Sequence, residues 1–443
     1  MPKYFHISTM GCQMNESSSD SMITHLKEAG YRQATGPENA DLMLINTCTV
    51  RAKAQQKAYS LLGRMIKLTK KRPDVILGFM GCIAQQEGAG LLKKFSRLDF
   101  VLGTREGERI IEILERVENG KERIVATDLS IKPVSILSPR DHFKGRVKDF
   151  LSIMEGCDNF CSYCIVPHVR GREVSHPPRE ILKQARNMVF QGIKDITLLG
   201  QNVNSYSFTE NGDQPVQFFE LLKMLNSLDG LKRIRFTTSH PKDLSVELIN
   251  CFGSLDKLCA HIHLPFQSGS NSILKAMNRK YTRNKYIKLI ENLREVRPDI
   301  SITSDVIVGF PGETQKDFDL TLDLMDKIEF DNLFSFKYSD RRGTIAADMS
   351  DKVGEAVMTD RLNILQNRQR EITFKKNKVL EGRIVEVLVE GKSKKGGQFT
   401  GRTKTNKVVN FTCNKIEVGD LIQVEIKQAF FNSLRGVATS DDS

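Results

Sequence analysis

Three cysteines stand close together in the pattern Cys157-x-x-x-Cys161-x-x-Cys164. Thiolates at this spacing on one loop can hold three irons of a 4Fe–4S cube, whereas a fully coordinated cube needs four ligands. The fourth iron is then open to an outside ligand, such as the amino and carboxylate groups of S-adenosylmethionine (SAM). Electron transfer into the sulfonium breaks a carbon–sulfur bond and yields a 5′-deoxyadenosyl radical. The motif therefore predicts a SAM-cleaving iron–sulfur site.

Zinc is the alternative ligand for this loop, with His168 as a fourth donor four residues beyond Cys164. Structural zinc usually joins two short ligand motifs from separate knuckles, and the sequence has no second knuckle. The spacing and the position of the loop directly after a strand-like run therefore favour the iron–sulfur interpretation.

A second set of three cysteines is spread over the first hundred residues. Cys12, Cys48 and Cys82 each follow a strand-like run, namely YFHIST, DLMLINT and VILGFM. Because the carboxyl ends of parallel strands line one crevice, these thiols could meet in space. They would hold a second cube with one exposed iron, which could carry an additional sulfur. Taken singly, each would more often be an inert buried thiol, and only the shared placement after three strands favours the cluster.

The remaining cysteines lie among ordinary helix or strand residues, and we expect them to be small buried hydrophobes. They are Cys251, Cys259 and Cys413.

Hydrophobic periodicity divides the chain into three blocks. Residues 1–135 alternate strand-like and helix-like segments, which predicts an open parallel α/β domain. A linker, IKPVSILSPRDHFKGR, leads to residues 146–373, where six strand–helix units are too few for the usual closed barrel of eight and predict a partial (β/α)6 barrel. Residues 375–439 read as short strands parted by Gly, Asn and Lys, which predicts a small antiparallel β-barrel.

Six strands are expected in the central block: FLSIME, DITLLG, RIRFTT, HIHLPF, SITSDVIVGF and NLFSFKYS.

Charge and composition limit the function classes. The net charge of +12 makes a polyanion such as nucleic acid a candidate partner. The segment from Lys375 to Lys407 contains ten Lys and Arg but only three acidic residues, so a basic face is expected on the last domain. The longest apolar stretch, Val75 to Ala84, is too short to cross a bilayer, and the start resembles no secretion signal. We therefore expect a soluble cytoplasmic protein with no membrane partner.

The motifs resemble those of a known family. GCQMN, NTCTVR and GCIAQ, around the first three cysteines, resemble the N-terminal domain of methylthiotransferases, and EGCDNFCSYCIVPHVRGREVS resembles their radical SAM loop. HLPFQSGSNSILKAMNR and SDVIVGFPGET are similar to later barrel segments, and the last block resembles a TRAM domain. GCQMN, GQNVNSY, TTSHPKDLS and GRTKTNKVVNF place the resemblance in the MiaB family, the tRNA-2-methylthio-N6-dimethylallyladenosine synthases. The loop FSFKYSDRRGTIAA departs from it at Arg342 and Ile345, where the family commonly has proline.

This resemblance implies roles for individual residues. The later trio holds the SAM-cleaving cluster, and the first trio holds an auxiliary cluster that receives and donates sulfur. Tyr163 matches a position whose backbone contacts the adenine of SAM. The other residues implied in the SAM pocket are Gly200, Gln201, Asn202, Gln267, Ser268 and Gly309. For the last three, strand-end turns that need Gly and short polar side chains are an equally good explanation.

The implied reaction uses SAM twice: one molecule methylates sulfur on the auxiliary cluster, and a second yields the radical that abstracts hydrogen from C2 of an isopentenylated adenosine beside the anticodon. Because the C2–H bond is inert to acid–base chemistry, we name no catalytic acid or base. The implied partners are a tRNA anticodon stem-loop, an electron donor and a sulfur source, and we expect a monomer.

Three alternatives stay open at this point. The same chemistry could act on threonylcarbamoyladenosine in tRNA or on a ribosomal protein. A zinc-stabilised RNA-binding protein without catalysis is the second. The third is a radical SAM enzyme in which Cys12, Cys48 and Cys82 are inert.

Overall fold

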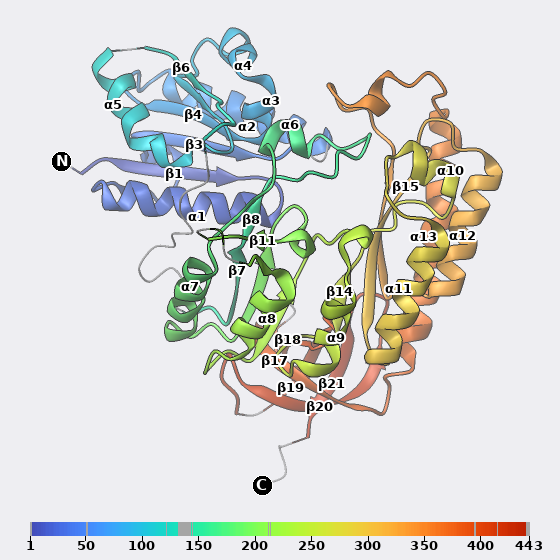
Figure 1. The fold of residues 1–443 in the computed structure, drawn as a ribbon. Helices are drawn as coiled ribbons and strands as arrows, with labels where there is room; N and C mark the ends of the chain where they lie inside the picture. The colour runs from blue at the N-terminus through green and yellow to red at the C-terminus, as the bar shows by residue number, and fades with distance from the viewer. Residues whose placement is uncertain are drawn as a thin grey trace.

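The N-terminal domain is a parallel sheet covered by helices on both faces (Figure 1). The computed structural model describes residues 2–49, 52–120, 122–131, 143, 145–210, 212, 214–393, 396–413 and 415–439. The six strands run in the order β2-β1-β3-β4-β5-β6, and every pairing is parallel. This confirms the predicted open α/β domain. The strands are β1 (Tyr4–Thr9), β2 (Arg32–Gln33), β3 (Leu42–Thr47), β4 (Ile76–Gly81), β5 (Phe100–Leu102) and β6 (Ile124–Ala126).

Two hydrophobic clusters, one on each side of this sheet, hold the helices to it. Strand β3 is buried at all six positions, as expected for a central strand of a parallel sheet. The helices are α1 (Gln13–Glu28), α2 (Ala52–Thr69), α3 (Cys82–Glu87), α4 (Ala89–Lys94) and α5 (Ile110–Gly120). Most of the predicted linker after residue 131 lies outside the described residues.

The central domain contains all six predicted strands, arranged as an open barrel. Two parallel three-stranded sheets have the orders β13-β10-β7 and β14-β15-β16. A parallel bridge from Ile234 to Leu258 extends β13 towards the second sheet. The strands are β7 (Lys148–Ser152), β10 (Asp195–Leu199), β13 (Arg233–Phe236), β14 (His261–His263), β15 (Ser301–Val308) and β16 (Asn332–Lys337).

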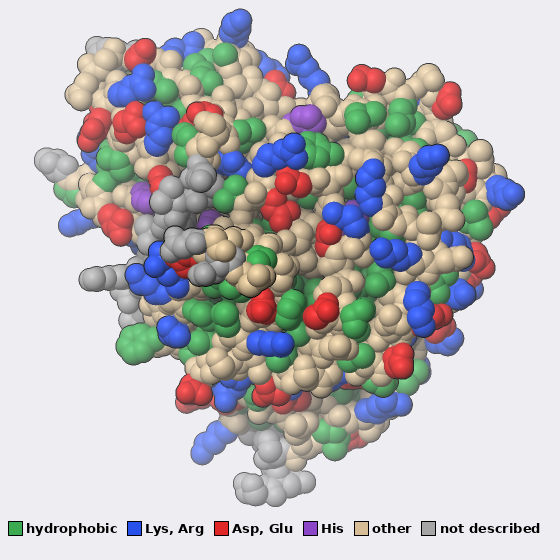
Figure 2. Space-filling view, in the orientation of Figure 1, with side chains coloured by type: hydrophobic (Ala, Val, Ile, Leu, Met, Phe, Trp, Pro, Cys, Tyr) green, Lys and Arg blue, Asp and Glu red, His purple; other side chains and the backbone are tan. Residues whose placement is uncertain are grey.

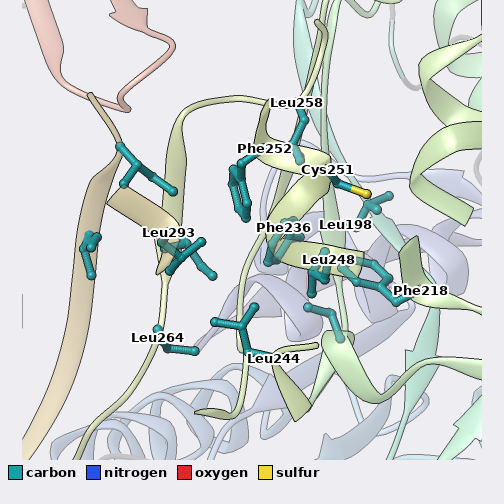
Figure 3. Close-up of a cluster of buried hydrophobic side chains, with 14 of the residues drawn as sticks. Leu198, Phe218, Phe236, Leu244, Leu248, Cys251, Phe252, Leu258, Leu264 and Leu293 are labelled. Atoms are coloured by element: carbon teal, nitrogen blue, oxygen red, sulfur yellow. The ribbon is translucent and has the colours of Figure 1, made fainter. Parts of the chain in front are cut away.

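The helices of this domain pack on the outside of the strands around one large core. Figure 3 shows part of this core, where Phe218, Phe236 and Phe252 lie beside Cys251. Cys251 and Cys259 are each 1% exposed, so both are buried as predicted, whereas Cys413 is only partly buried. The helices are α6 (Val166–Arg170), α7 (Pro178–Phe190), α8 (Phe218–Asn226), α9 (Val246–Ser254), α10 (Asn271–Ala276), α11 (Arg283–Val296), α12 (Gln315–Ile328) and α13 (Glu355–Lys378).

The C-terminal domain is a closed five-stranded barrel in the order β17-β18-β19-β21-β20. Four pairings are antiparallel, as predicted, and the pairing of β19 with β21 is parallel. The sequence predicts strands in GRIVEVLVEG, QFTGRT, KVVNFTC and DLIQVEIKQA, and it does not predict β21, a short segment with a central glycine. The strands are β17 (Ile384–Lys392), β18 (Phe399–Thr403), β19 (Val408–Thr412), β20 (Leu421–Ala429) and β21 (Leu434–Ala438).

The small barrel lies at one end of the open barrel (Figure 1), and buried arginines fasten it there. The Arg233 side chain is fully buried and donates to the Glu386 carboxylate at 2.9 Å and to a carbonyl of β18. Arg235 donates to Asp195 at 2.9 Å and to the Thr403 carbonyl at 2.8 Å. The C-terminal domain therefore forms part of the barrel floor. Among the described residues, none of the helices has the length and apolar character needed to span a membrane.

Candidate iron–sulfur sites and the cavity between the domains

The first cysteine trio gathers at the carboxyl edge of the N-terminal sheet. Cys12 directly precedes α1, Cys48 follows β3, and Cys82 is the first residue of α3. Cys12 and Cys48 are hydrogen-bonded to each other. A Cβ atom on Gly11 would lie 2.4 Å from the Cys48 Cβ, so only glycine, here at φ +143°, allows the two loops to approach this closely.

Cys12 has the electrostatics of a thiolate ligand. The hydrogen bond with Cys48, the charge of Arg170 and the backbone N–H groups of Asn15 and Met14 lower its pKa to about 5 from an ordinary value of 9.0, although burial acts in the opposite direction. Helix N-termini and nearby cations stabilise thiolates in this way. The surroundings of Cys12 therefore favour the thiolate, which is the form that binds a metal.

Two arginines of the central domain face this trio. Arg170 ends α6, and its interactions with Cys82, Glu155 and Cys12 raise its pKa against the effect of burial. Arg341, in the loop after β16, lies close enough to Cys48 for that thiol's charge to raise its pKa, although burial lowers it more. The first trio therefore lies at the junction of two domains.

The second trio lies on the loop between β8 (Met154–Glu155) and α6. The loop is anchored by Ser162, whose N–H donates to the Met277 carbonyl at 3.0 Å and whose hydroxyl donates to the Ala276 carbonyl at 2.8 Å. The Arg279 guanidinium donates to Cys161 Sγ at 3.5 Å. Only glycine fits at position 156, where the loop starts with φ +79°, because a Cβ there would lie 2.0 Å from the Arg172 carbonyl oxygen.

Burial dominates the electrostatics of the second trio, whereas a hydrogen bond dominates those of Cys12. Burial raises the pKa of Cys157 to about 11, and burial together with the charge of Cys161 raises that of Cys164 to about 12. The raised pKa values favour the protonated thiols. A bound metal reverses this preference, because a coordinating thiol is deprotonated. The second trio therefore becomes anionic when it binds a metal.

Both trios fit an iron–sulfur cube better than a single ion. Each consists only of thiols, and each has a buried arginine beside a sulfur to balance the charge of thiolates. Within the part of the chain that the structure describes, no three His, Cys, Asp or Glu side chains form a group that could hold one metal ion. Ligands of a cube each bind their own iron and stand farther apart than ligands that share one ion. His168, the proposed zinc ligand, is exposed.

Three of the predicted SAM-pocket residues lie at strand ends near the second trio. The Gln201 side-chain oxygen accepts the Gly156 N–H and so contacts the start of the cysteine loop. Asn202 donates to Asp243 at 2.8 Å, and its own amide oxygen is buried without a hydrogen-bond partner. Gln267 also has a buried, unpartnered amide oxygen and a left-handed backbone, at φ +64°. Buried unsatisfied groups of this kind are typical of a ligand site.

Other predicted residues have evident roles in the fold. Ser268 is 1% exposed, and its hydroxyl accepts the Ser270 N–H at 3.2 Å. The Gly309 N–H donates to the Glu313 carboxylate at 2.7 Å. Gly200 lies against Met154, where a Cβ would be 2.4 Å from its Cγ. Tyr163 packs against a small apolar cluster that includes Met277. These contacts explain the residue types, and their contact with SAM stays a prediction.

A cavity of about 1160 Å³ fills the interior of the open barrel. Cys12 lies in its wall beside α1, and the loop between β18 and β19 contributes Asn406 and Lys407. Phe334 and Phe336 of β16 also line it, with exposed fractions of 48% and 37%. The cavity therefore brings all three domains to one space, and it is large enough for a modified nucleoside.

Phe334 and Phe336 were not singled out by sequence reasoning. Their spacing of two within NLFSFK places them on one face of the strand, but the same pattern is typical of a filled core. His263 packs edge-to-face on Phe334 at 5.9 Å between ring centroids. The sequence shows that Arg170 follows the cysteine loop, but its contact with the first trio, like that of Arg279 with Cys161, is found only once the domains and loops are placed.

Positive charge is not gathered on the face of the molecule seen in Figure 2, where Lys and Arg alternate with Asp and Glu. The expected basic face of the last domain is therefore not evident from this side. Several of its cations are used internally, such as Lys407, which bonds Asp331 at 3.1 Å.

Comparison with known proteins agrees with this architecture. Residues 151–325 match the Radical SAM superfamily, residues 4–103 match Uncharacterized protein family UPF0004, and residues 378–439 match the TRAM domain. The cobalamin-binding radical SAM methyltransferase TsrM from Kitasatospora setae has a similar fold, with a TM-score of 0.57 at 13% identity over 78% of this chain and 77% of that one. The radical SAM enzyme OxsB gives 0.55 at 14% identity, over 83% and 56%.

The fold, the cysteine loop and these matches define a radical SAM enzyme with an additional N-terminal domain and a TRAM barrel. Its sequence is 49% identical to the tRNA-2-methylthio-N(6)-dimethylallyladenosine synthase of Syntrophus aciditrophicus, over 98% of this chain and 94% of that protein. The same-named protein of Geobacter metallireducens is 47% identical over 98% of each chain. The chain belongs to the tRNA-2-methylthio-N(6)-dimethylallyladenosine synthase family.

Proposed function

We propose that this protein attaches a methylthio group to C2 of N6-isopentenyladenosine beside the anticodon of tRNA. The observation that carries the proposal is that Cys12 lies in the wall of a cavity formed by all three domains. A substrate base in that cavity would meet the sulfur-bearing side of the first trio. The near full-length similarity to synthases of this name supports the choice of substrate.

The chain provides separate ligand sets for two 4Fe–4S clusters. Cys157, Cys161 and Cys164 would hold the SAM-binding cluster, and the first trio would hold the auxiliary one. When bound, the clusters supply reductive cleavage of SAM and a site for sulfur. The protein's own contribution is to keep the thiols near each other and to balance their charge with arginines.

The SAM pocket follows from the strand ends beside the second trio. Gln201 and Asn202 would bind the amino group, and the unpartnered oxygen of Asn202 is free to accept from it. Gln267 offers a second such oxygen. The backbone of Tyr163 would contact the adenine, while Gly200, Ser268 and Gly309 would shape the pocket.

The cavity wall suits a prenylated base. Phe334 and Phe336 present aromatic rings to the open space, and burying apolar surface on binding contributes about 25 cal/mol per Å². The isopentenyl group would gain this burial, whereas the polar threonylcarbamoyl group would lose hydration on the same wall. This contrast favours N6-isopentenyladenosine over threonylcarbamoyladenosine as the substrate.

The remaining roles are part of the same proposal. The TRAM barrel would hold the anticodon stem-loop while its β18–β19 loop reaches the cavity. An electron donor and a sulfur source would act from outside, and the enzyme would work as a cytoplasmic monomer.

Nucleoside analysis of bulk tRNA tests the substrate. In cells that lack the gene, N6-isopentenyladenosine should accumulate at the expense of its 2-methylthio derivative, and the wild-type gene should restore it. A Phe334→Ala variant should restore less than the wild type, because part of the apolar wall is removed. If deletion instead depletes the methylthio derivative of threonylcarbamoyladenosine, the proposed substrate is wrong.

A further inference from the structure

Arg170 occupies an unusual place between the two cysteine trios. It is the last residue of α6, the helix that follows the second trio, and its guanidinium faces the first trio in the other domain. Only 5% of its side chain is exposed. A charged group in such a place interacts strongly with its neighbours, because water does not screen it.

The partners of Arg170 are mainly sulfur. Its guanidinium is hydrogen-bonded with Cys82, and Glu155 and Cys12 lie close enough to interact with its charge. The ion pair with Glu155 is loose, since Nη1 lies 3.8 Å from the carboxylate oxygen. Both of these atoms are buried without a hydrogen-bond partner. The Glu155 carboxylate therefore does not fully neutralise the Arg170 guanidinium, which can also interact with an anionic cluster at the first trio.

The surroundings of Cys82 are otherwise apolar. Cys82, Ile165 and Val169 form one buried cluster, so α6 covers this thiol with hydrocarbon on one side and places the Arg170 charge close by. The N-terminal domain is tied to the same helix end, where Thr104 donates to the Val169 carbonyl at 2.6 Å and Arg105 to the Arg172 carbonyl at 2.6 Å. The position of Arg170 is thus fixed by the docking of the two domains.

We propose that Arg170 is a positioning residue that sets the reduction potential of the auxiliary cluster held by Cys12, Cys48 and Cys82. Hydrogen bonds to cluster sulfurs and local charge tune the potentials of iron–sulfur clusters. A fixed positive charge favours the reduced state, which carries one more electron. The inference rests on the proposed function only in requiring that the first trio holds a cluster.

The experiment uses the full-length chain with Cys157, Cys161 and Cys164 all changed to alanine, so that only the auxiliary cluster is left. Arg170→Gln, which removes the charge, is compared with Arg170→Lys, which retains it. Arg172→Gln is the matched control, because that side chain is 72% exposed and lies two residues away. Iron is counted first, and the midpoint potential is then measured by an EPR-monitored titration with dithionite.

Arg170→Gln should lower the equilibrium constant for one-electron reduction about tenfold, which is about 59 mV. Arg170→Lys should keep most of the wild-type potential, and Arg172→Gln should keep all of it. A glutamine variant with full iron and an unchanged potential would overturn the inference. If Arg170→Gln binds no iron, a lowered midpoint potential in Arg170→Lys would overturn the inference instead. If the starting protein, with only the three alanine substitutions, binds no iron, the proposed auxiliary site is wrong as well.

Discussion

Replacing Cys12 with alanine should lower the iron content of anaerobically purified protein from about eight to about four atoms per chain. The variant should still cleave SAM to 5′-deoxyadenosine, because the second trio lies on a separate loop of the central domain. Methylthiolation should be lost, with no detectable product. The physical reason is that Cys12 is the thiol of the first trio that lines the cavity, where its hydrogen bond with Cys48 and the charge of Arg170 favour the thiolate.

The reciprocal variant, Cys157→Ala, should also contain about four irons, but it should cleave no SAM. Cys413→Ala is the matched control: this thiol belongs to the C-terminal barrel, and its loss should change neither the iron count nor SAM cleavage. An iron content that stays at about four in both wild type and Cys12→Ala would mean that the first trio is inert. One zinc and no iron would support the zinc-stabilised alternative instead.

The second large effect concerns the buried pair Arg361–Glu313, at 2.7 Å with 6% and 1% of the two side chains exposed. Glu313 also accepts the Gly309 N–H, so the pair fixes the GFPGE turn in which a SAM contact is predicted. Arg361→Met leaves a buried carboxylate without its counter-charge, which should lower the free energy of unfolding by about 3 to 5 kcal/mol. Pulse proteolysis in urea measures this loss on the full-length protein.

A surface pair on the same helix is the control. Arg368 bonds Asp326 at 2.6 Å with 46% and 43% of the side chains exposed, so Arg368→Met should cost less than about 1 kcal/mol. Adding Glu313→Gln to Arg361→Met should recover part of the stability, because the uncompensated charge is gone. If the double variant is no more stable than Arg361→Met alone, the loss comes from packing and not from charge.

The same variant should show a defined pH dependence. Burial raises the pKa of Glu313, and Arg361 acts against this rise, so removing the arginine raises the pKa further. A carboxyl with a higher pKa in the folded state binds its proton more tightly there than in the unfolded chain. The deficit of Arg361→Met should therefore shrink as the pH falls from about 8 to about 5. A deficit that grows over this range would contradict the assignment.

Sequence patterns predicted the elements well because the elements follow from local periodicity. The runs before Cys12, Cys48 and Cys82 are strands of a parallel sheet, and in such a sheet topology alone brings the strand ends to one edge. The parallel pairing of β19 with β21 could not be predicted, because it depends on how the small barrel closes.

The sequence predicts candidate ligands but not their surroundings. The cysteine spacing and the family motifs predict both trios, whereas Arg170 reaches Cys82 across 88 positions of sequence and only through the docking of two domains. Phe334 and Phe336 follow the alternation of any half-buried strand. This face of β16 meets an open cavity because the barrel is incomplete. Local sequence patterns do not predict that the barrel is incomplete.

The most direct measurement uses an anticodon stem-loop whose isopentenyladenosine carries deuterium at C2, incubated with the reconstituted enzyme, SAM and a reductant. Our account predicts deuterium in the released 5′-deoxyadenosine and a methylthio group at C2 of the same nucleoside. Methylthiolated product without transfer of deuterium to 5′-deoxyadenosine, or cleavage of SAM with no change in the nucleoside, would contradict it.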